Sequence, residues 1–484
     1  MGDIDIGSRV SEGMHFLIVS GAAQGQITPA RRLARALVAA APARVRATLA
    51  VPLSALRRMF PGETKASAAA GEGAVVFSDG GGVDYAAFTD GFDDGFRPER
   101  FDGAAFVGRL QLVGPASLSR LAAALRIRGR PVTCVVYTLL LPFAAAVAAE
   151  LGVPSYFFWT MPAAVLSLYH HYFHGRHAVL SAAAGDDPDR RVEVSGLEFL
   201  RARDLPSLLT APSPYLPAFR DMFHVIESSA PTRVLVNTFD ALEPEALASV
   251  LPAIELIPVG PMVTDSTDHS SGDLFDHDDD AIYMSYLDAQ RDASVVYVAF
   301  GSLAVLSARQ IDEIRRCLDS TGRPFLWVVR RDNRRCDDDA CNAPKCGMVV
   351  EWCRQERVLG HRAVGCFVTH CGWNSTLEAV ASGVPVVMAP QWSDQATNAR
   401  MAEARWGIGV RAEANAEDGG AVLCSELARG IDAVMGDSDG AWAIRRRARE
   451  WKARAAAAMG GGAAASNLRR FVEGVAVGSQ RVKS

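Results

Sequence analysis

The stretch that decides the fold is "GCFVTHCGWNSTLEAV", residues 365–380. An apolar, β-rich run ends at Thr369 and is followed by a glycine-containing turn and then by a helical run. This order predicts a strand, a tight turn and a helix, which is the unit of a parallel α/β sheet. We expect Gly372 to open the turn and Asn374 or Ser375 to cap the helix. Free backbone N–H groups and the positive end of the helix dipole would then face a ligand site that favours an anion such as a diphosphate.

The side chains around this turn suit a ligand that carries phosphate, a sugar and a flat ring. His370 can donate a hydrogen bond to the same anion, and Glu378, one helical turn later, can accept hydrogen bonds from two ribose hydroxyls. Trp352 offers a flat face for a base. Asp394 and Gln395 follow the next predicted strand and offer polar groups to a sugar. These residues alone predict an anion site beside sugar-binding groups.

Strands and helices alternate along most of the chain. Near-continuous apolar strands separated by helical runs indicate parallel sheets that are covered on both faces. A first series of strands is predicted at 15–20, 45–52, 74–80, 131–137 and 154–160, and a second at 294–302, 324–330, 365–372 and 384–390. We therefore expect an α/β protein with two facing, doubly wound domains and a ligand cleft at the carboxyl ends of the strands. Ser302, in a Gly-Ser-Leu turn after one of these strands, is either a second phosphate contact or part of a tight turn.

The composition argues against several classes of partner. The 484 residues carry a net charge of −5, so neither a nucleic-acid surface nor an anionic membrane surface is expected. The longest apolar stretch, 133–152, contains a proline and changes from β-rich to Ala-rich, so we interpret it as a buried strand and a helix rather than a membrane span. The polar, acidic residues 1–13 do not resemble a signal peptide, which favours a cytoplasmic protein with free thiols. No metal is expected, because zinc-site spacing is missing from Cys336, Cys341, Cys346 and Cys353.

Residues 352–395 resemble the signature box of the plant family 1 UDP-dependent glycosyltransferases. The "HCGWNS" core, the "GVP" tripeptide and the closing "DQ" pair all match, and the resemblance covers nearly the whole chain. Within the family, the chain is most similar to the branch of anthocyanin 5-O-glucosyltransferases and indole-3-acetate glucosyltransferases. The resemblance implies a GT-B fold, with two Rossmann-like domains facing each other across a cleft. It places an acceptor-binding domain at 1–259, a linker at 260–281, a UDP-sugar-binding domain at 282–462, and a last helix, about 463–484, that returns to the first domain.

The resemblance also implies a role for each position of the box. Stacking on uracil is implied for Trp352, ribose binding for Gln355 and Glu378, and sugar contacts for Trp373, Asp394 and Gln395. Diphosphate binding is implied for Ser302, His370, Asn374 and Ser375, and the donor-binding set also includes Cys353 and Gly372. Gln395 at the last position implies glucose. The expected partners are a UDP-sugar and a small aromatic or carboxylic acceptor, with no cofactor, no nucleic acid, no stable membrane insertion and a monomeric state.

The stretch "GAAQGQITPA", residues 21–30, departs from the family at its catalytic position. Family members carry "PAQGHINP", whose His deprotonates the acceptor hydroxyl, and Gln26 stands in that position here. The Asp that orients the His is replaced by Thr138, after the strand that ends near Tyr137. An amide can donate and accept hydrogen bonds but cannot take a proton. We also expect Pro29 in the first turn of the helix that follows.

Three functions remain open on these grounds. An inverting UDP-glucose-dependent glucosyltransferase that forms glucose esters is most compatible with Gln26, because a carboxylate is already ionised at neutral pH. The alternatives are an O-glucosyltransferase for phenolic hydroxyls such as those of flavonoids, and a UDP-sugar-binding protein with little turnover. The stretch "HHYFHGRH", 170–177, is either a lining of the acceptor pocket or a metal site or substitute base, since His170, His174 and His177 have helical spacing.

Overall fold

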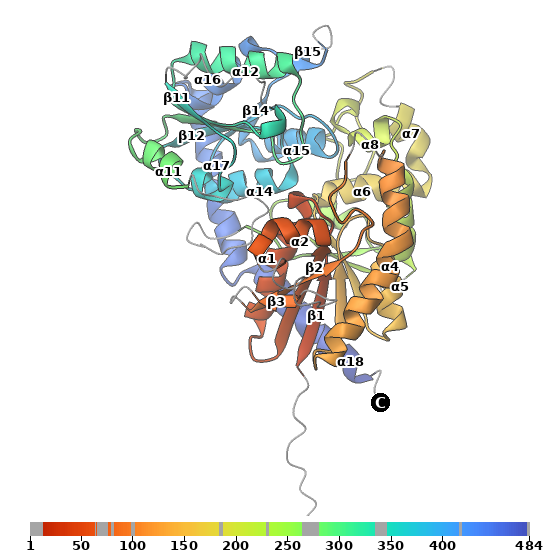
Figure 1. Cartoon of the computed structure of the whole chain (residues 1–484). Coiled ribbons are helices and arrows are strands. Elements are labelled where there is room, and N and C mark those ends of the chain that lie inside the picture. The colour runs from red at the N-terminus through yellow and green to blue at the C-terminus, as the bar shows by residue number, and fades with distance from the viewer. Residues whose placement is uncertain are drawn as a thin grey trace, which may run out of the picture.

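The computed structural model describes residues 13–62, 64, 76–78, 82–97, 102–182, 187–228, 232–263, 280–333, 346–415 and 419–481. The chain forms two sheets of mostly parallel strands with helices packed around each of them (Figure 1). The expected α/β GT-B architecture, with two Rossmann-like halves, is confirmed. Within the described residues, no helix is both long enough and apolar enough to cross a membrane.

The N-terminal half is built on an eight-stranded sheet with the order β3-β4-β2-β1-β5-β6-β7-β8. All neighbours in it are parallel except β3, which runs antiparallel to β4 at the edge. Its strands are β1 (Met14–Val19), β2 (Val45–Pro52), β3 (Val76–Ser78), β4 (Val83–Phe88), β5 (Cys134–Tyr137), β6 (Ser155–Trp159), β7 (Arg233–Val236) and β8 (Glu255–Pro258). The helical segments are α1 (Gln24–Ala40), α2 (Leu53–Met59), α4 (Gly103–Ile127), α5 (Phe143–Glu150), α6 (Ala163–His171), η1 (Tyr172–Arg176), α7 (His177–Ala182), η2 (Ala202–Asp204), α8 (Ser207–Thr210), α9 (Leu216–Glu227) and α10 (Pro244–Ala248).

The C-terminal half is built on a six-stranded parallel sheet with the order β11-β10-β9-β12-β13-β14. Its strands are β9 (Val295–Ala299), β10 (Phe325–Val328), β11 (Gly347–Val350), β12 (Val364–Thr369), β13 (Val386–Met388) and β14 (Gly409–Arg411), with a separate hairpin of β15 (Ala414–Asn415) and β16 (Ala421–Val422). The helical segments are α11 (Asp280–Asp288), α12 (Ala308–Thr321), η3 (Arg331–Asn333), α13 (Gln355–Leu359), α14 (Trp373–Ser382), α15 (Gln395–Met401), η4 (Ala402–Trp406), α16 (Cys424–Met435), α17 (Asp439–Met459) and α18 (Ala463–Arg481).

In its two large sheets the structure adds strands that the sequence did not predict, namely β4, β7, β8, β11 and β14. Four of these span only three or four residues, and apolar runs of that length do not distinguish a strand from a loop. Most of the predicted linker 260–281 lies outside the described residues.

The expectation that Pro29 lies in the first turn of its helix is wrong. The helix α1 begins at Gln24, five residues before Pro29, so the proline lies inside it. A proline has no N–H to donate to the carbonyl four residues before it. The Gly25 carbonyl is therefore left without its helical partner. It accepts a hydrogen bond from Asn374 Nδ2 at 3.0 Å instead, and Asn374 belongs to α14 of the other half. A break in one helix thus creates a contact between the two halves.

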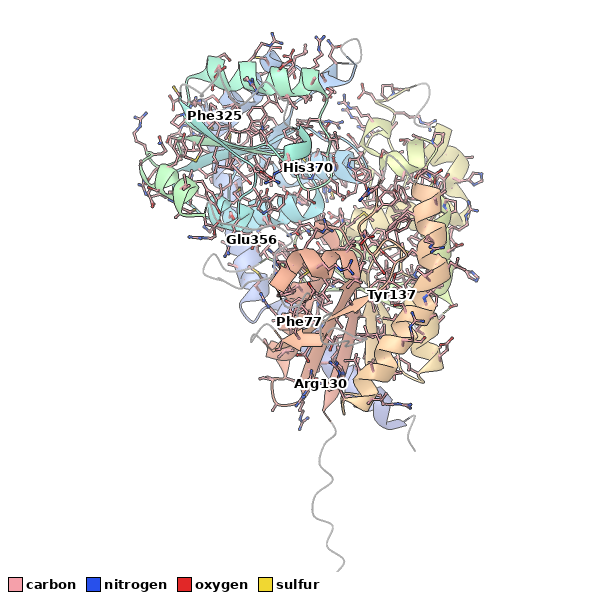
Figure 2. All side chains as sticks on the ribbon, in the orientation of Figure 1. Phe77, Arg130, Tyr137, Phe325, Glu356 and His370 are labelled. Carbon is pink, nitrogen blue, oxygen red and sulfur yellow. The ribbon has the colours of Figure 1, made fainter. Side chains whose placement is uncertain are left out.

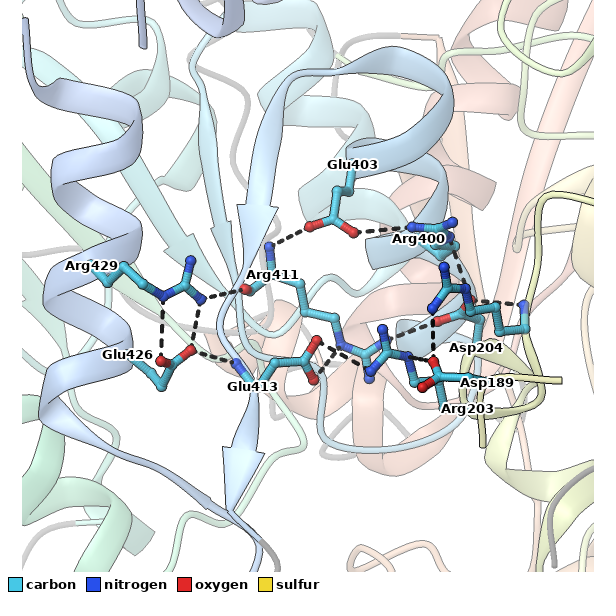
Figure 3. A network of polar contacts seen from close by, with 10 residues as sticks. Asp189, Arg203, Asp204, Arg400, Glu403, Arg411, Glu413, Glu426 and Arg429 are labelled. Atoms are coloured by element: carbon cyan, nitrogen blue, oxygen red, sulfur yellow. Dashed lines mark hydrogen bonds and ion pairs between the residues drawn. The ribbon is translucent and has the colours of Figure 1, made fainter. Parts of the chain in front are cut away.

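A buried carboxylate in the N-terminal half anchors the C-terminal half at a second place (Figure 3). Asp204 is 1% exposed and forms ion pairs with Arg411 at 3.0 Å and with Arg400 at 3.5 Å. Its backbone carbonyl accepts a hydrogen bond from Thr397 Oγ1 at 2.6 Å. Nearby, Ser207 and Ser393 exchange two hydrogen bonds of 2.7 and 2.9 Å. These contacts fix the loop that follows β13 against the N-terminal half.

The last helix, α18, packs on the N-terminal half, against α1 and β8 (Figure 1). Its apolar face buries Leu468, Phe471, Val472 and Val475 in the same cluster as residues of β1 and β2. Asn467 Nδ2 donates to the carbonyl of Pro258 at 2.8 Å. The chain therefore crosses between the two halves twice.

Replacing Val475 by Ala should destabilise the protein, because this side chain is 1% exposed. The loss of two buried methyl groups and the cavity that remains should lower the free energy of unfolding by about 2 kcal/mol. Val477→Ala is the matched control, because Val477 lies on the same helix but is 57% exposed. Urea denaturation measures both. Equal losses in the two variants would show that α18 does not pack as described.

Candidate functional site

A cleft between the two halves collects the predicted donor-binding residues. Its lining comes from the start of α1 and from the loops that follow β9, β12 and β13. All predicted positions of the box contribute, namely Trp352, Cys353, Gln355, His370, Gly372, Trp373, Asn374, Ser375, Glu378, Asp394 and Gln395, and Ser302 and Gln26 join them. Thr138 is fully buried and is not among the described residues that line the cleft.

His370 sits between two glycines that leave room for its ring. A Cβ atom at Gly301 or at Gly372 would lie 2.5 Å from His370 Nε2, so any side chain there would displace the imidazole. Burial, and then the nearby Arg330 cation, lower the pKa of His370 to about 4. In the ligand-free protein at neutral pH, His370 is therefore a neutral imidazole that offers an N–H group rather than a cation.

The N-terminus of α14 opens toward the cleft, but not with the predicted cap. The N-cap residue is Gly372, which has no side chain to satisfy the first backbone N–H groups. Asn374 and Ser375 lie within the first turn, so the expectation that either of them caps the helix is wrong. Asn374 instead bonds to Gly25, as described above, and Ser375 accepts from Gln355. The free N–H groups and the helix dipole suit an anion at this end.

A hydrogen-bond chain holds Glu378 from one side. Gln355 Nε2 donates to Glu378 Oε2 at 2.7 Å and to Ser375 Oγ at 2.8 Å. Gln355 Oε1 in turn accepts from Tyr297 at 3.2 Å. The Tyr297 hydroxyl also lies 3.3 Å from Cys353 Sγ. Burial raises the pKa of the Cys353 thiol to about 12, so this group is a neutral packing partner beneath the site.

Arg32 of α1 reaches Glu378 from the other side. Arg32 Nη1 lies 3.5 Å from Glu378 Oε1, and Arg32 Nη2 lies 2.7 Å from Glu356 Oε1. Burial, and then repulsion from Glu356, raise the pKa of Glu378 to about 7, while Arg32 opposes the shift. Figure 2 places Glu356 at the boundary between the two halves. Sequence reasoning missed Arg32, because nothing in its own neighbourhood indicates a partner more than 300 residues away.

Trp373 is buried at the contact between the two halves. It is 4% exposed, and its indole N–H donates to the carbonyl of Asn237 in the N-terminal half at 2.7 Å. Its ring lies 6.1 Å from that of Trp406. Trp352, by contrast, is half-buried and lines the cleft. Trp352 and Trp373 therefore differ in what they can offer to a ligand.

Asp394 and Gln395 are held in place by their own loop. Asn398 Nδ2 donates to Asp394 Oδ2 at 2.8 Å, and Gln395 Oε1 accepts from the backbone N–H groups of Gln391 and Trp392 at 2.8 and 3.1 Å. With its oxygen engaged, the Gln395 amide presents its NH₂ group as the remaining donor. Burial raises the pKa of Asp394.

Positive backbone φ angles mark three of the loops at the cleft. Leu140, Cys371 and Ser393 have φ of 67°, 64° and 60°, a region that costs non-glycine residues of order 1 kcal/mol or more. Cys371 separates His370 from Gly372, and Ser393 precedes Asp394. The sharp turns aim these neighbours at the cleft. A fourth such residue, Ala293, precedes β9 at the opposite end of that strand.

Gln26 lies in the first turn of α1, and its oxygen is held on the protein side. Gln26 Oε1 accepts from the backbone N–H of Gly21 at 3.2 Å and from the Thr138 hydroxyl at 3.0 Å. A backbone N–H can only donate, so the atom that faces it must be the amide oxygen. The Gln26 NH₂ group has no hydrogen bond to any described residue of the chain, and Gln26 is one of the residues that line the cleft.

The histidines of segment 170–177 cluster around a carboxylate instead of lining the cleft. His170 Nδ1 and His174 Nε2 each lie 3.2 Å from a different oxygen of Glu227, and the two rings stack at 4.2 Å with an angle of 28°. Burial, and then the neighbouring His174, lower the pKa of His170, and the ligand atoms of the two imidazoles and the carboxylate lie within 4.8 Å of one another, so this group could also hold a metal ion. His177 contacts Tyr172. None of these residues belongs to the described lining of the cleft, so the expected role in an acceptor pocket is not supported.

Comparison with known proteins identifies relatives along almost the full chain. The family model "UDP-glucoronosyl and UDP-glucosyl transferase" matches residues 275–435. Crocetin glucosyltransferase, chloroplastic, from Gardenia jasminoides is 39% identical, over 96% of this chain and 98% of its own. Phloretin 4'-O-glucosyltransferase from Malus domestica is 38% identical over the same shares. Anthocyanidin 3-O-glucoside 5-O-glucosyltransferase 1 from Perilla frutescens is 37% identical over 95% of this chain and 98% of its own.

Solved structures agree with these relatives. Os79 from O. sativa in complex with UDP superimposes with a TM-score of 0.80 at 29% identity, covering 95% of this chain and all of that one. The same protein in complex with U2F and trichothecene gives a TM-score of 0.79 at 30% identity, with the same coverage. The predicted resemblance is confirmed: the chain belongs to the plant UDP-dependent glycosyltransferases, enzymes that take a UDP-sugar as their donor substrate and need no cofactor.

Proposed function

We propose that this enzyme transfers glucose from UDP-glucose to a carboxylate of a small acceptor and forms a glucose ester. The observation that carries the proposal is the orientation of Gln26. With its oxygen bound to Gly21 and Thr138, the amide offers only N–H donors to the cleft. Such a group binds an acceptor that is already an anion and cannot take a proton from an alcohol.

The donor would lie along the C-terminal side of the cleft. We propose that the N-terminus of α14 and the N–H of His370 bind the diphosphate, with Ser302 beside them. Trp352 would stack on the uracil, and Glu378 would accept hydrogen bonds from the ribose hydroxyls. Asp394, Gln395 and the pocket around Trp373 would receive the glucose. In this arrangement residues 282–462 hold the donor and residues 1–259 hold the acceptor. The monomeric state and the cytoplasmic location stay predictions from the sequence.

The reaction would be a single displacement at the anomeric carbon. A carboxylate oxygen of the acceptor forms the new C–O bond from the face opposite the leaving group. The bond between the anomeric carbon and the β-phosphate oxygen breaks, and its electron pair leaves with UDP. The configuration inverts, and no proton changes place. The N–H of neutral His370 and the α14 dipole stabilise the charge that develops on the diphosphate.

Named relatives act on acceptors as different as crocetin and phloretin, so the acceptor of this chain is decided by its own residues. A phenol or an aliphatic alcohol needs a general base, which typically contributes about 10² to 10⁴ in rate. The remaining alternative is a protein that binds UDP-glucose but does not transfer the glucose. Measuring UDP release with different acceptors distinguishes this protein from an active enzyme.

Gln26→His should add activity on phenols while the original enzyme turns over mainly carboxylates. Paired acceptors that differ only in a hydroxyl or carboxyl group, with UDP release as the readout, measure both. We expect phenol turnover to rise by about 10² or more in the variant, because an imidazole can accept the proton. Gln24→His is the matched control, since Gln24 lines the cleft on the same turn but is not held by Thr138.

Ester formation is rejected if the original enzyme glucosylates phenols and leaves carboxylates untouched. Silence on every acceptor, with turnover restored only by Gln26→His, would show that the chain binds the donor without using it.

Gly372→Ala should weaken the binding of UDP-glucose. The new Cβ would lie 2.5 Å from His370 Nε2 and displace the ring from its place beside the phosphates. Losing a hydrogen bond to a charged group costs about 1.5 to 3 kcal/mol, so the dissociation constant should rise at least about tenfold in calorimetry. Gly474→Ala on α18 is the control, because its Cβ meets open space. Unchanged affinity in Gly372→Ala would remove His370 from the proposed diphosphate site.

A further inference from the structure

One arginine of the N-terminal half, Arg32, contacts two carboxylates of the C-terminal half. Arg32 is 9% exposed and lies six residues after Gln26 on α1. Its guanidinium contacts Glu356 at 2.7 Å and Glu378 at 3.5 Å, and also donates to the carbonyl of Met262 at 2.6 Å. An arginine keeps its charge at every pH of interest and can hold several oxygens in one plane. Three segments distant in sequence therefore meet at this side chain.

The contacts leave Glu378 with free acceptor positions. Arg32 approaches Oε1, and Gln355 donates to Oε2 at 2.7 Å. A carboxylate has about four lone-pair positions, so two remain for ligand hydroxyls. This capacity depends on ionisation, because a protonated carboxyl group loses an acceptor position and gains a donor.

We infer that Arg32 is a positioning residue for ribose recognition, which holds Glu378 as an oriented carboxylate and makes that state depend on contact between the two halves. The inference deepens the proposed function and rests on it, since it takes Glu378 as the ribose ligand. The ligand is the ribose of a nucleoside diphosphate sugar. Arg32 acts through Glu378, and the helix that carries it also carries Gln26, so the donor and acceptor sides of the cleft share one element.

The charges around Glu378 make the inference testable by pH. Arg32 faces it from α1 and Glu356 from α13, and two further ionisable groups lie near it, Tyr297 of β9 and Cys353. Burial keeps the pKa of Tyr297 and of Cys353 far above neutrality, so both stay uncharged. The pKa of Glu378 is raised to about 7, so its carboxylate is lost as the pH falls through that value. Donor affinity should therefore weaken on acidification near neutrality.

Two substitutions should move this midpoint in opposite directions. Arg32→Gln removes the only opposing cation among these described neighbours and should raise the midpoint. Glu356→Gln removes the like charge and should lower it. The probe is UDP-glucose without acceptor, because each of its two phosphates has a single, strongly acidic P–OH group, so its charge is constant from pH 5.5 to pH 8.5. His370 is unchanged in every variant, so its contribution to the pH dependence is common to all of them. Arg120→Gln on the exposed face of α4 is the control.

Calorimetric titrations across this pH range measure the dissociation constants. We expect Arg32→Gln to bind UDP-glucose about fivefold more weakly at pH 7, because a midpoint raised by about one pH unit lowers the ionised fraction of Glu378 at that pH from about one half to about one eleventh. Arg32→Lys should recover part of the loss. The 2′-deoxyribose form of UDP-glucose should be discriminated by the original protein and much less by Arg32→Gln.

Each outcome decides a different point. Opposite midpoint shifts together with lost discrimination at the 2′ position support the inference. Equal weakening of both donors with an unmoved midpoint shows that Arg32 only stabilises the fold, and overturns it. A protein that does not bind UDP-glucose at any pH would refute the proposed function itself.

Discussion

Parallel strands all end at the same edge of their sheet, and this constraint places every candidate site residue. In each half the loops after the carboxyl ends of the strands face the other half, so residues far apart in sequence meet without a dedicated scaffold. Ser302 follows β9, His370 follows β12 and Asp394 follows β13. The non-glycine residues with positive φ in these loops carry backbone strain, which accompanies the sharp turns toward the cleft.

Several contacts between the two halves use groups that also belong to the site. Asn374 binds the carbonyl that Pro29 leaves free, Trp373 donates to Asn237, and Arg32 bridges to Glu378. Each contact uses a hydrogen bond or an ion pair, not only apolar packing. These groups lie beside the positions proposed for the UDP-sugar. The shape of the site therefore depends on how the two halves are placed relative to each other.

Sequence reasoning found what is encoded locally. The strand, turn and helix around Gly372 follow from periodicity and glycine chemistry, and the box residues line one cleft as expected. It failed where the outcome depends on distant partners. No residue near Arg32 in the sequence indicates Glu378 as its partner. The expectation that Pro29 lies in a first turn is wrong because it does not consider a donor from the other half, Asn374, for the carbonyl that the proline leaves free. The histidine run could not be interpreted from its own neighbourhood for the same reason, since Glu227, which lies beside His170 and His174, is more than 50 residues away.

The replacement of a base by an amide at position 26 need not abolish transfer, because the demand for a base depends on the acceptor. A phenol with a pKa near 10 must lose its proton before or during attack, and at pH 7 this preparation costs about 4 kcal/mol. A carboxylic acid with a pKa near 4 has already lost it. In the proposed reaction the Gln26 amide, whose oxygen is held by Gly21 and Thr138, donates its N–H groups to an existing anion and cannot take a proton from a neutral hydroxyl. Under the proposed function, the same substitution that removes the base therefore selects the acceptor that does not require one.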